Sequence, residues 1–150
     1  MGTRNSTIVT LNKKVRVAQY GQWDGYPTGQ GKTIQKFLQN VNMEDFKKKV
    51  NALREPTKLE NEAIEKMPDW ENRYPHLSRD AGADVLNMIA AGDVEFVVLD
   101  KDFKYDGLMC EYWYDINLDD ETVTMNGNKY TINEWIQPGF MELLEERIED

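Results

Sequence analysis

Cysteine and histidine are almost absent from this chain, which holds one residue of each type among its 150 residues. A single cysteine, Cys110, excludes an internal disulfide, and such sparse use of cysteine is typical of proteins of the cytoplasm. A single histidine, His76, excludes a metal site built on several histidines. We therefore expect a cytoplasmic protein that carries no metal and needs no other cofactor.

Long apolar runs and an excess of basic residues are also missing. No apolar run approaches the roughly 18 residues that a membrane span needs, so we expect no membrane partner. Asp and Glu number 27 against 18 Lys and Arg, which gives a formal net charge of −9. Because affinity for nucleic-acid phosphates depends on Lys and Arg, we expect no direct binding to nucleic acid. The length of 150 residues predicts a single domain over residues 1–150.

The N-terminal part of the chain alternates between strand-like and helix-like patterns. Residues 6–11 and 15–20 are rich in β-branched and aromatic residues on either side of a short polar turn, which predicts a β-hairpin. A glycine-rich loop follows the hairpin. Apolar residues at helical spacing then predict a helix over residues 33–41, and Asn42 is well suited to cap a second helix.

The middle of the chain is less regular. Three prolines divide residues 54–78 into short pieces, and Ser78 is a suitable cap for a third full helix that Gly92 ends. Residues 94–99 are apolar and β-branched, so we expect a strand there. The pattern of residues 109–116 predicts another strand.

The C-terminal part carries the strongest turn signal of the sequence. Residues 121–125 and 128–132 flank Asn126-Gly127, whose tolerance of positive φ is typical of a hairpin turn. Pro138 then suits the first turn of a final helix. The order of a hairpin, helices, a meander and a helix favours an α+β fold with a single mostly antiparallel sheet. That sheet would combine the N-terminal hairpin with the C-terminal meander, and the helices would pack on it.

The loop over residues 22–31 has two interpretations. In the structural one, Gly25 and Gly29 turn the chain, Pro27 stiffens it, and the aromatic rings cover the end of the sheet. The loop is not a P-loop, because the first glycine of that motif would fall on Tyr26.

In the functional interpretation, the loop binds a ligand. The rings of Trp23 and Tyr26 suit a flat group, and backbone amides at the start of the following helix suit an anion. Arg4 opens the first strand, and we expect Arg79 and Asp80 to approach the same place. The predicted ligand-binding residues are Arg4, Gln22, Trp23, Asp24, Tyr26, Gln30, Arg79 and Asp80.

Several blocks of the chain, including the stretch VAQYGQWDGYP, resemble a signature shared by a family of small bacterial, phage and fungal proteins. The resemblance implies that the loop, Arg4 and Arg79-Asp80 are family features, and it implies no particular activity. Asn5 followed by Ser6 departs from the family pattern, so the resemblance assigns no role to Asn5. The similar segments are residues 1–4, 17–27, 29–31, 77–80, 82–83 and 111–119.

These observations favour a non-catalytic protein that binds a small anionic, nucleotide-like ligand. In a phage-type protein, that ligand would be a host-defence signal, and the protein would inhibit host defence by sequestering it. One alternative is a nucleotide-processing enzyme that uses Asp24 or Asp80 as a base in the same pocket. Another is an inhibitor that imitates nucleic acid toward a basic host protein, and the sequence also leaves a homo-oligomer open. The acidic face of such an inhibitor would comprise Asp115, Asp119, Asp120, Glu121 and residues 142–150.

Overall fold

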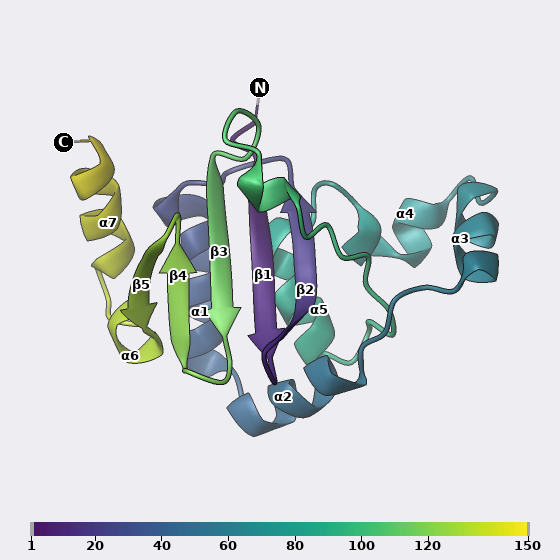
Figure 1. The fold of residues 1–150 in the computed structure, drawn as a ribbon, viewed down its shortest axis with the longest axis horizontal. Helices are drawn as coiled ribbons and strands as arrows, with labels where there is room; N and C mark the ends of the chain where they lie inside the picture. The colour runs from purple at the N-terminus through teal and green to yellow at the C-terminus, as the bar shows by residue number, and fades with distance from the viewer. Residues whose placement is uncertain (1, 150) are drawn as a thin grey trace.

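The computed structural model describes residues 2–149 and has an α+β fold built on one five-stranded sheet (Figure 1). The order across the sheet is β2-β1-β3-β4-β5. Neighbouring strands are antiparallel except for β1 and β3, which run parallel. The predicted combination of an N-terminal hairpin and a C-terminal meander is therefore confirmed. The strands are β1 (Asn5–Leu11), β2 (Lys14–Gly21), β3 (Tyr112–Asn117), β4 (Thr122–Met125) and β5 (Asn128–Thr131).

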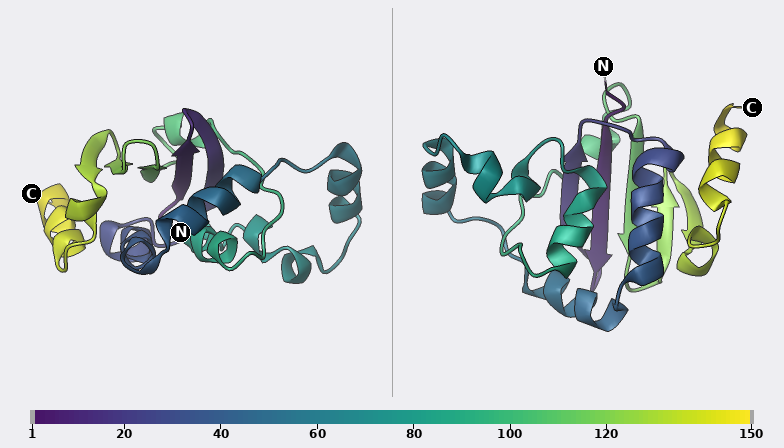
Figure 2. Two further views of the ribbon diagram at one scale, coloured as in Figure 1. Left: turned by 90° about the horizontal axis from the view of Figure 1, so that it is seen from below. Right: turned by 180° about the vertical axis from the view of Figure 1, so that it is seen from behind.

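Helices cover one face of the sheet and extend beyond both of its edges (Figure 2). The covering helices are α1 (Lys32–Asn40), α2 (Met43–Ala52) and α5 (Val85–Ala90). Beyond β5 lie α6 (Ile132–Trp135) and α7 (Phe140–Glu149). Beyond β2, α3 (Lys58–Glu65) and α4 (Trp70–Arg73) form an arm over residues 58–73 that stands away from the sheet. Within residues 2–149, no helix is long and apolar enough to cross a membrane.

The hydrophobic core lies between the sheet and the covering helices. Ile34 of α1 and Leu86 of α5 are fully buried in it. The rings of Phe37 and Phe46 meet edge to face across α1 and α2, with centroids 4.8 Å apart. Asn42 caps α2 as predicted, because its side chain accepts a hydrogen bond from the backbone N–H of Asp45. The apolar spacing of the sequence thus places these two helices correctly.

The helix expected from Ser78 to Gly92 is wrong in its first half. The Ser78 hydroxyl accepts the N–H of Asp80 in a turn, and a short η3 (Gly82–Asp84) precedes α5. Gly82 has a φ of +49°, a conformation that interrupts a right-handed helix. The helix therefore begins only at Val85.

The strand expected over residues 94–99 is also wrong, because this segment forms no ladder with any strand of the described residues. Phe96 forms only an isolated bridge with Arg54. The strand expected over residues 109–116 begins later, at Tyr112. The Asp106 carboxylate accepts hydrogen bonds from the backbone N–H groups of Leu108 and Met109, and this local turn keeps the start of the predicted strand out of the sheet.

Candidate functional site

The glycine-rich loop lies at the end of the sheet where β1 begins and β2 ends (Figure 1). The loop includes the single turn η1 (Pro27–Gly31), which leads directly into α1. Two backbone hydrogen bonds tie it to other parts of the chain. Gly25 donates to the Thr3 carbonyl at 3.1 Å, and Gln22 donates to the Arg79 carbonyl at 2.9 Å. The N-terminus, the loop and the turn after Ser78 therefore meet at one place.

Asn5 supports the loop from the start of β1, although no role was expected for it from the sequence. Its side chain is fully buried, and its amide donates to the carbonyls of Thr3 and Trp23, each at 3.0 Å. Opposite Asn5 in the hairpin stands Gly21, where a Cβ atom would lie 2.3 Å from the Asn5 side-chain oxygen. The sequence contained one sign of this role, namely that the register of the predicted hairpin pairs the polar Asn5 with a glycine.

Gln30 is a second internal support of the loop. Its amide nitrogen donates to the Trp23 carbonyl at 3.0 Å, and its amide oxygen accepts the N–H of Ala83 at 2.8 Å. A Cβ atom on Gly82 would lie 2.8 Å from the Gln30 side chain, which explains a glycine at that position. Gln30 therefore joins the loop to η3, and both ends of its amide are occupied by protein groups.

Tyr114 supports the loop from the core. Its side chain is fully buried in β3, and its hydroxyl donates to the Gly25 carbonyl at 2.5 Å. Burial raises the pKa of this hydroxyl well above its usual value, so the group is a lasting hydrogen-bond donor. The loop also closes on itself, since Gln30 N–H donates to the Asp24 carbonyl at 2.7 Å. Gly29 passes so close to that carbonyl that a Cβ atom would lie 2.2 Å from it.

Above these supports, five exposed side chains belong to the loop and to the turn after Ser78, and we call them the platform. The rings of Trp23 and Tyr26 are 48% and 49% exposed, so neither is a buried plug. The Trp23 indole N–H donates to the Asp80 carboxylate at 2.7 Å. Among the described residues, neither the Asp24 carboxylate nor the Arg79 guanidinium makes a hydrogen bond or an ion pair, and both are exposed. The platform consists of Trp23, Asp24, Tyr26, Arg79 and Asp80.

Arg4 and Gln22, also predicted to bind ligand, have contacts of other kinds. The backbone of Arg4 bonds to the segment before β3, where its N–H donates to the Glu111 carboxylate at 3.1 Å. Within residues 2–149, the side-chain Nε of Arg4 is buried without a hydrogen-bond partner. The Gln22 amide oxygen accepts the Tyr20 hydroxyl at 2.6 Å. The structure thus brings Trp23 and Asp80 together directly, whereas the polar contacts of Arg4 and Gln22 lie beside the platform.

Four of the acidic side chains expected to imitate nucleic acid make contacts within the fold. Asp115 is half-buried and accepts a threonine hydroxyl of β1, and burial raises its pKa. Asp119 accepts two backbone N–H groups from the turn between β1 and β2, which lower its pKa. Glu142 pairs with a lysine of α1 at 2.6 Å, and Glu145 accepts a threonine hydroxyl of η1 at 2.8 Å. Asp150 lies outside the described residues.

Neither the single cysteine nor the single histidine is activated as a nucleophile or a base. Burial raises the pKa of the Cys110 thiol to about 11, which disfavours the reactive thiolate. Burial lowers the pKa of His76, which packs between the rings of Tyr74 and Phe96 at the base of the arm. Over residues 2–149, no group of three or more His, Cys, Asp or Glu side chains is arranged to hold a metal ion.

No protein-family model matches the sequence, and comparison with curated proteins and with solved structures gives no significant match. The chemistry of the platform therefore indicates what the protein can bind. Two exposed rings, one unpaired cation and two carboxylates can recognise a ligand by stacking, charge and hydrogen bonding. Because buried side chains fix the loop beneath them, these groups are already arranged before a ligand arrives.

Proposed function

We propose that the protein is a non-catalytic binding protein of the cytoplasm whose platform recognises a small anionic, nucleotide-like ligand. One observation carries the proposal. The half-exposed rings of Trp23 and Tyr26 lie on a loop that buried Asn5 and Tyr114 and half-buried Gln30 hold in place. This support leaves the rings open to solvent, and the loop also brings in the turn that carries Arg79.

Each group of the platform has a matching part in such a ligand. Stacking of a base on an aromatic side chain contributes about 1–3 kcal/mol, and it tolerates different bases. The Arg79 guanidinium suits a phosphate, to which it can donate two parallel hydrogen bonds. The Asp24 carboxylate suits a ribose hydroxyl or the N–H edge of a base. The resemblance to phage proteins extends the proposal to a host-defence signal that the protein sequesters.

The test is a thermal-shift screen of cyclic and ADP-ribose-type nucleotides, followed by calorimetric titration of any ligand found. A ligand at a hundred times its dissociation constant should stabilise the protein by about 2.7 kcal/mol. The variants Trp23→Ala and Arg79→Ala should abolish this stabilisation. The matched control is Tyr105→Ala, which removes a ring that is 75% exposed and lies outside the platform.

The same variants separate a binding role from a structural one. Because nearly half of Trp23 is exposed, Trp23→Ala should lower the free energy of unfolding by less than about 1.5 kcal/mol, whereas a fully buried ring would cost about 3–5 kcal/mol. If no nucleotide stabilises the wild-type protein, the proposal fails. It also fails if Tyr105→Ala weakens binding as much as Trp23→Ala does.

A further inference from the structure

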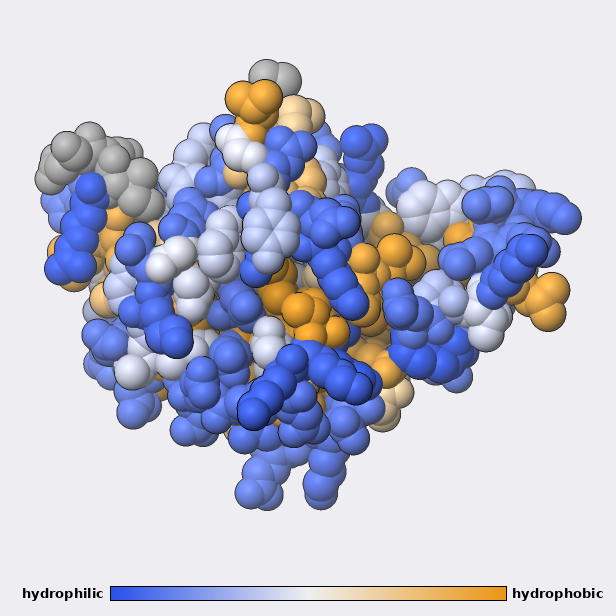
Figure 3. All heavy atoms as spheres, in the orientation of Figure 1, coloured by the Kyte–Doolittle hydropathy of each residue, from blue (hydrophilic) through white to orange (hydrophobic). Residues whose placement is uncertain are grey.

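A cleft of about 440 Å³ separates the edge of β2 from the arm. Figure 3 shows apolar surface in the hollow between the body of the molecule and the arm. Apolar side chains come from both sides, with Ala18 on β2 and Val98 beside it facing Ile64 and Trp70 of the arm. Val98 is 52% exposed, so apolar surface of the body is open to the cleft. A volume of this size is within the range of small-molecule sites.

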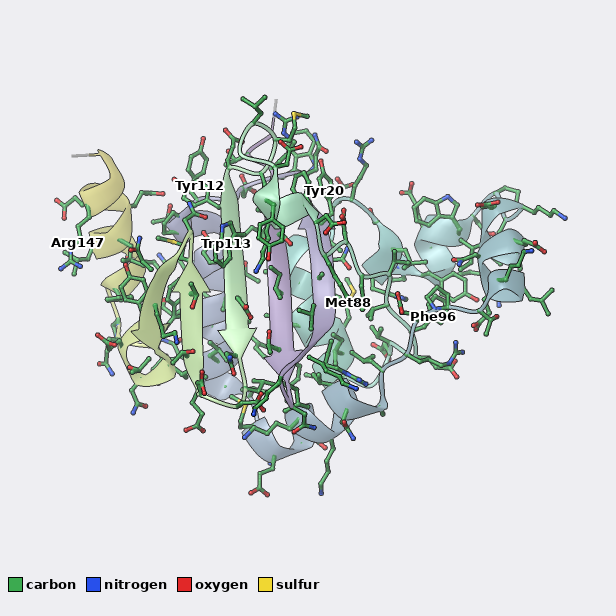
Figure 4. The ribbon with its side chains drawn as sticks, viewed as in Figure 1. Tyr20, Met88, Phe96, Tyr112, Trp113 and Arg147 are labelled. Carbon is green, nitrogen blue, oxygen red and sulfur yellow. The ribbon has the colours of Figure 1, made fainter. Side chains whose placement is uncertain are left out.

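The base of the arm is built as a packed unit. Phe96 lies between the sheet and the arm (Figure 4) and contacts the rings of Tyr74 and His76, with centroids 5.4 Å and 5.6 Å away. The Arg54 guanidinium lies over the Phe96 ring, 5.6 Å from its centroid. Because these contacts hold the arm at a distance from β2, the cleft exists without a ligand.

The charged residues that line the cleft, among those described, are both acidic. Glu65 lines it from the arm, and Asp100 lines it from the side of the sheet. Neither carboxylate makes a hydrogen bond or an ion pair with any described residue, and both are exposed. Of the residues that the structure describes, no lysine or arginine lines the cleft, whereas the aromatic rings of Tyr20 and Trp70 do. Carboxylates and aromatic faces are the two protein groups that attract an organic cation.

We propose that this cleft binds a small organic cation, namely a protonated or quaternary amine that carries an apolar body. The apolar body would lie among Ala18, Ile64, Trp70 and Val98, and the ammonium group would lie toward Glu65 and Asp100. An added peptide strand does not fit here, because the Ala18 carbonyl on the edge of β2 already accepts the N–H of Asp100 at 3.0 Å. The ligand is opposite in charge to the one proposed for the platform, so the two proposals are tested with different compounds.

The test uses three compounds that share one apolar body and differ in charge: phenylbutylamine, phenylbutanol and phenylbutyrate. Each is titrated into the ¹⁵N-labelled full chain, and the NMR signals of the four tryptophan indole groups are followed. The amine should shift the Trp70 signal and leave that of Trp23 unchanged. We expect the amine to bind about tenfold more tightly than the alcohol, and the carboxylate to bind more weakly than both.

Substitutions then assign this preference to the two carboxylates. The double variant Glu65→Gln with Asp100→Asn should reduce the affinity for the amine to that of the alcohol, and leave the affinity for the alcohol unchanged. Glu62→Gln is the matched control, since Glu62 is exposed on α3 and does not line the cleft. The proposal is overturned if the amine fails to shift Trp70 or binds no better than the alcohol. It is also overturned if Glu62→Gln weakens amine binding as much as the double variant does.

Discussion

Replacing Asn5 with alanine removes the side chain that fixes the glycine-rich loop to the start of the sheet. The Asn5 amide donates two hydrogen bonds at 3.0 Å, to the carbonyls of Thr3 and Trp23, from a fully buried position. Each such bond stabilises a folded protein by a net 0.5–1.5 kcal/mol, about 2 kcal/mol for the pair. The variant therefore tests whether the loop depends on a residue outside it.

Two features of the structure refine this magnitude. Both carbonyls keep a second donor, because Gly25 N–H also bonds to Thr3 and the Gln30 amide also bonds to Trp23. They are therefore not left unsatisfied, and no further desolvation cost arises. The Asn5 side-chain oxygen has no donor, so its removal offsets part of the loss. We expect Asn5→Ala to lower the free energy of unfolding by about 1–2 kcal/mol, which corresponds to about 2–8 °C in Tm.

Urea denaturation followed by tryptophan fluorescence measures the change, with the m-value as a check that the unfolded state is the same. Asn51→Ala is the matched control, because Asn51 is exposed on α2 and its side chain makes no hydrogen bond within the described residues. It should change stability by less than about 0.5 kcal/mol. Asn5→Asp should cost more than Asn5→Ala, because it also buries a carboxylate charge that faces two carbonyl oxygens. A loss for Asn5→Ala no larger than that for Asn51→Ala would refute the reasoning.

Two further predictions concern the buried titratable residues. Burial lowers the pKa of His76, so the folded state favours neutral imidazole, and stability should fall as the pH drops below about 6.5, the usual value. Urea midpoints at about pH 7.5 and about pH 5.5 should show this loss in the wild-type protein and a smaller one in His76→Gln. Burial raises the pKa of Cys110 to about 11, so iodoacetamide should alkylate it slowly at neutral pH and rapidly in guanidinium chloride. Equal rates in the two conditions would contradict the burial of the thiol.

The parts of the fold that the sequence predicts are those with a local cause. Asn42 caps α2 through its own side chain, and Asn126 and Gly127 take the positive φ values that a tight hairpin needs. Such features depend on a few adjacent residues, so residue type and spacing are sufficient to find them. Residues 94–99 show the opposite case, because a strand requires a partner that lies elsewhere in the chain. Their apolar composition correctly indicated that Phe96 and Val97 are buried. It did not indicate that the backbone there is irregular.

In the candidate site, too, some features could be predicted from the sequence and others could not. The density of aromatic and polar residues in the loop located the platform, and Trp23, Tyr26, Asp24, Arg79 and Asp80 are exposed there. Composition did not separate these exposed residues from Gln30, whose amide is occupied by internal hydrogen bonds. That distinction depends on where η3 lies relative to the loop, which is a tertiary relation. The cleft beside β2 was not predicted at all, because its walls come from segments far apart in the sequence.

The parallel pairing of β1 with β3 has a consequence for how the chain folds as it is synthesised. Asn5 pairs with Tyr112, so the centre of the sheet joins residues 107 positions apart. At about 5–20 residues per second, a ribosome needs roughly 5–20 s to make the intervening chain. Until β3 emerges, one edge of β1 has no partner, and the buried side chains of the hairpin have no completed core. For that time the nascent hairpin exposes an unpaired strand edge and apolar side chains, the two features that make a partly folded chain prone to aggregate.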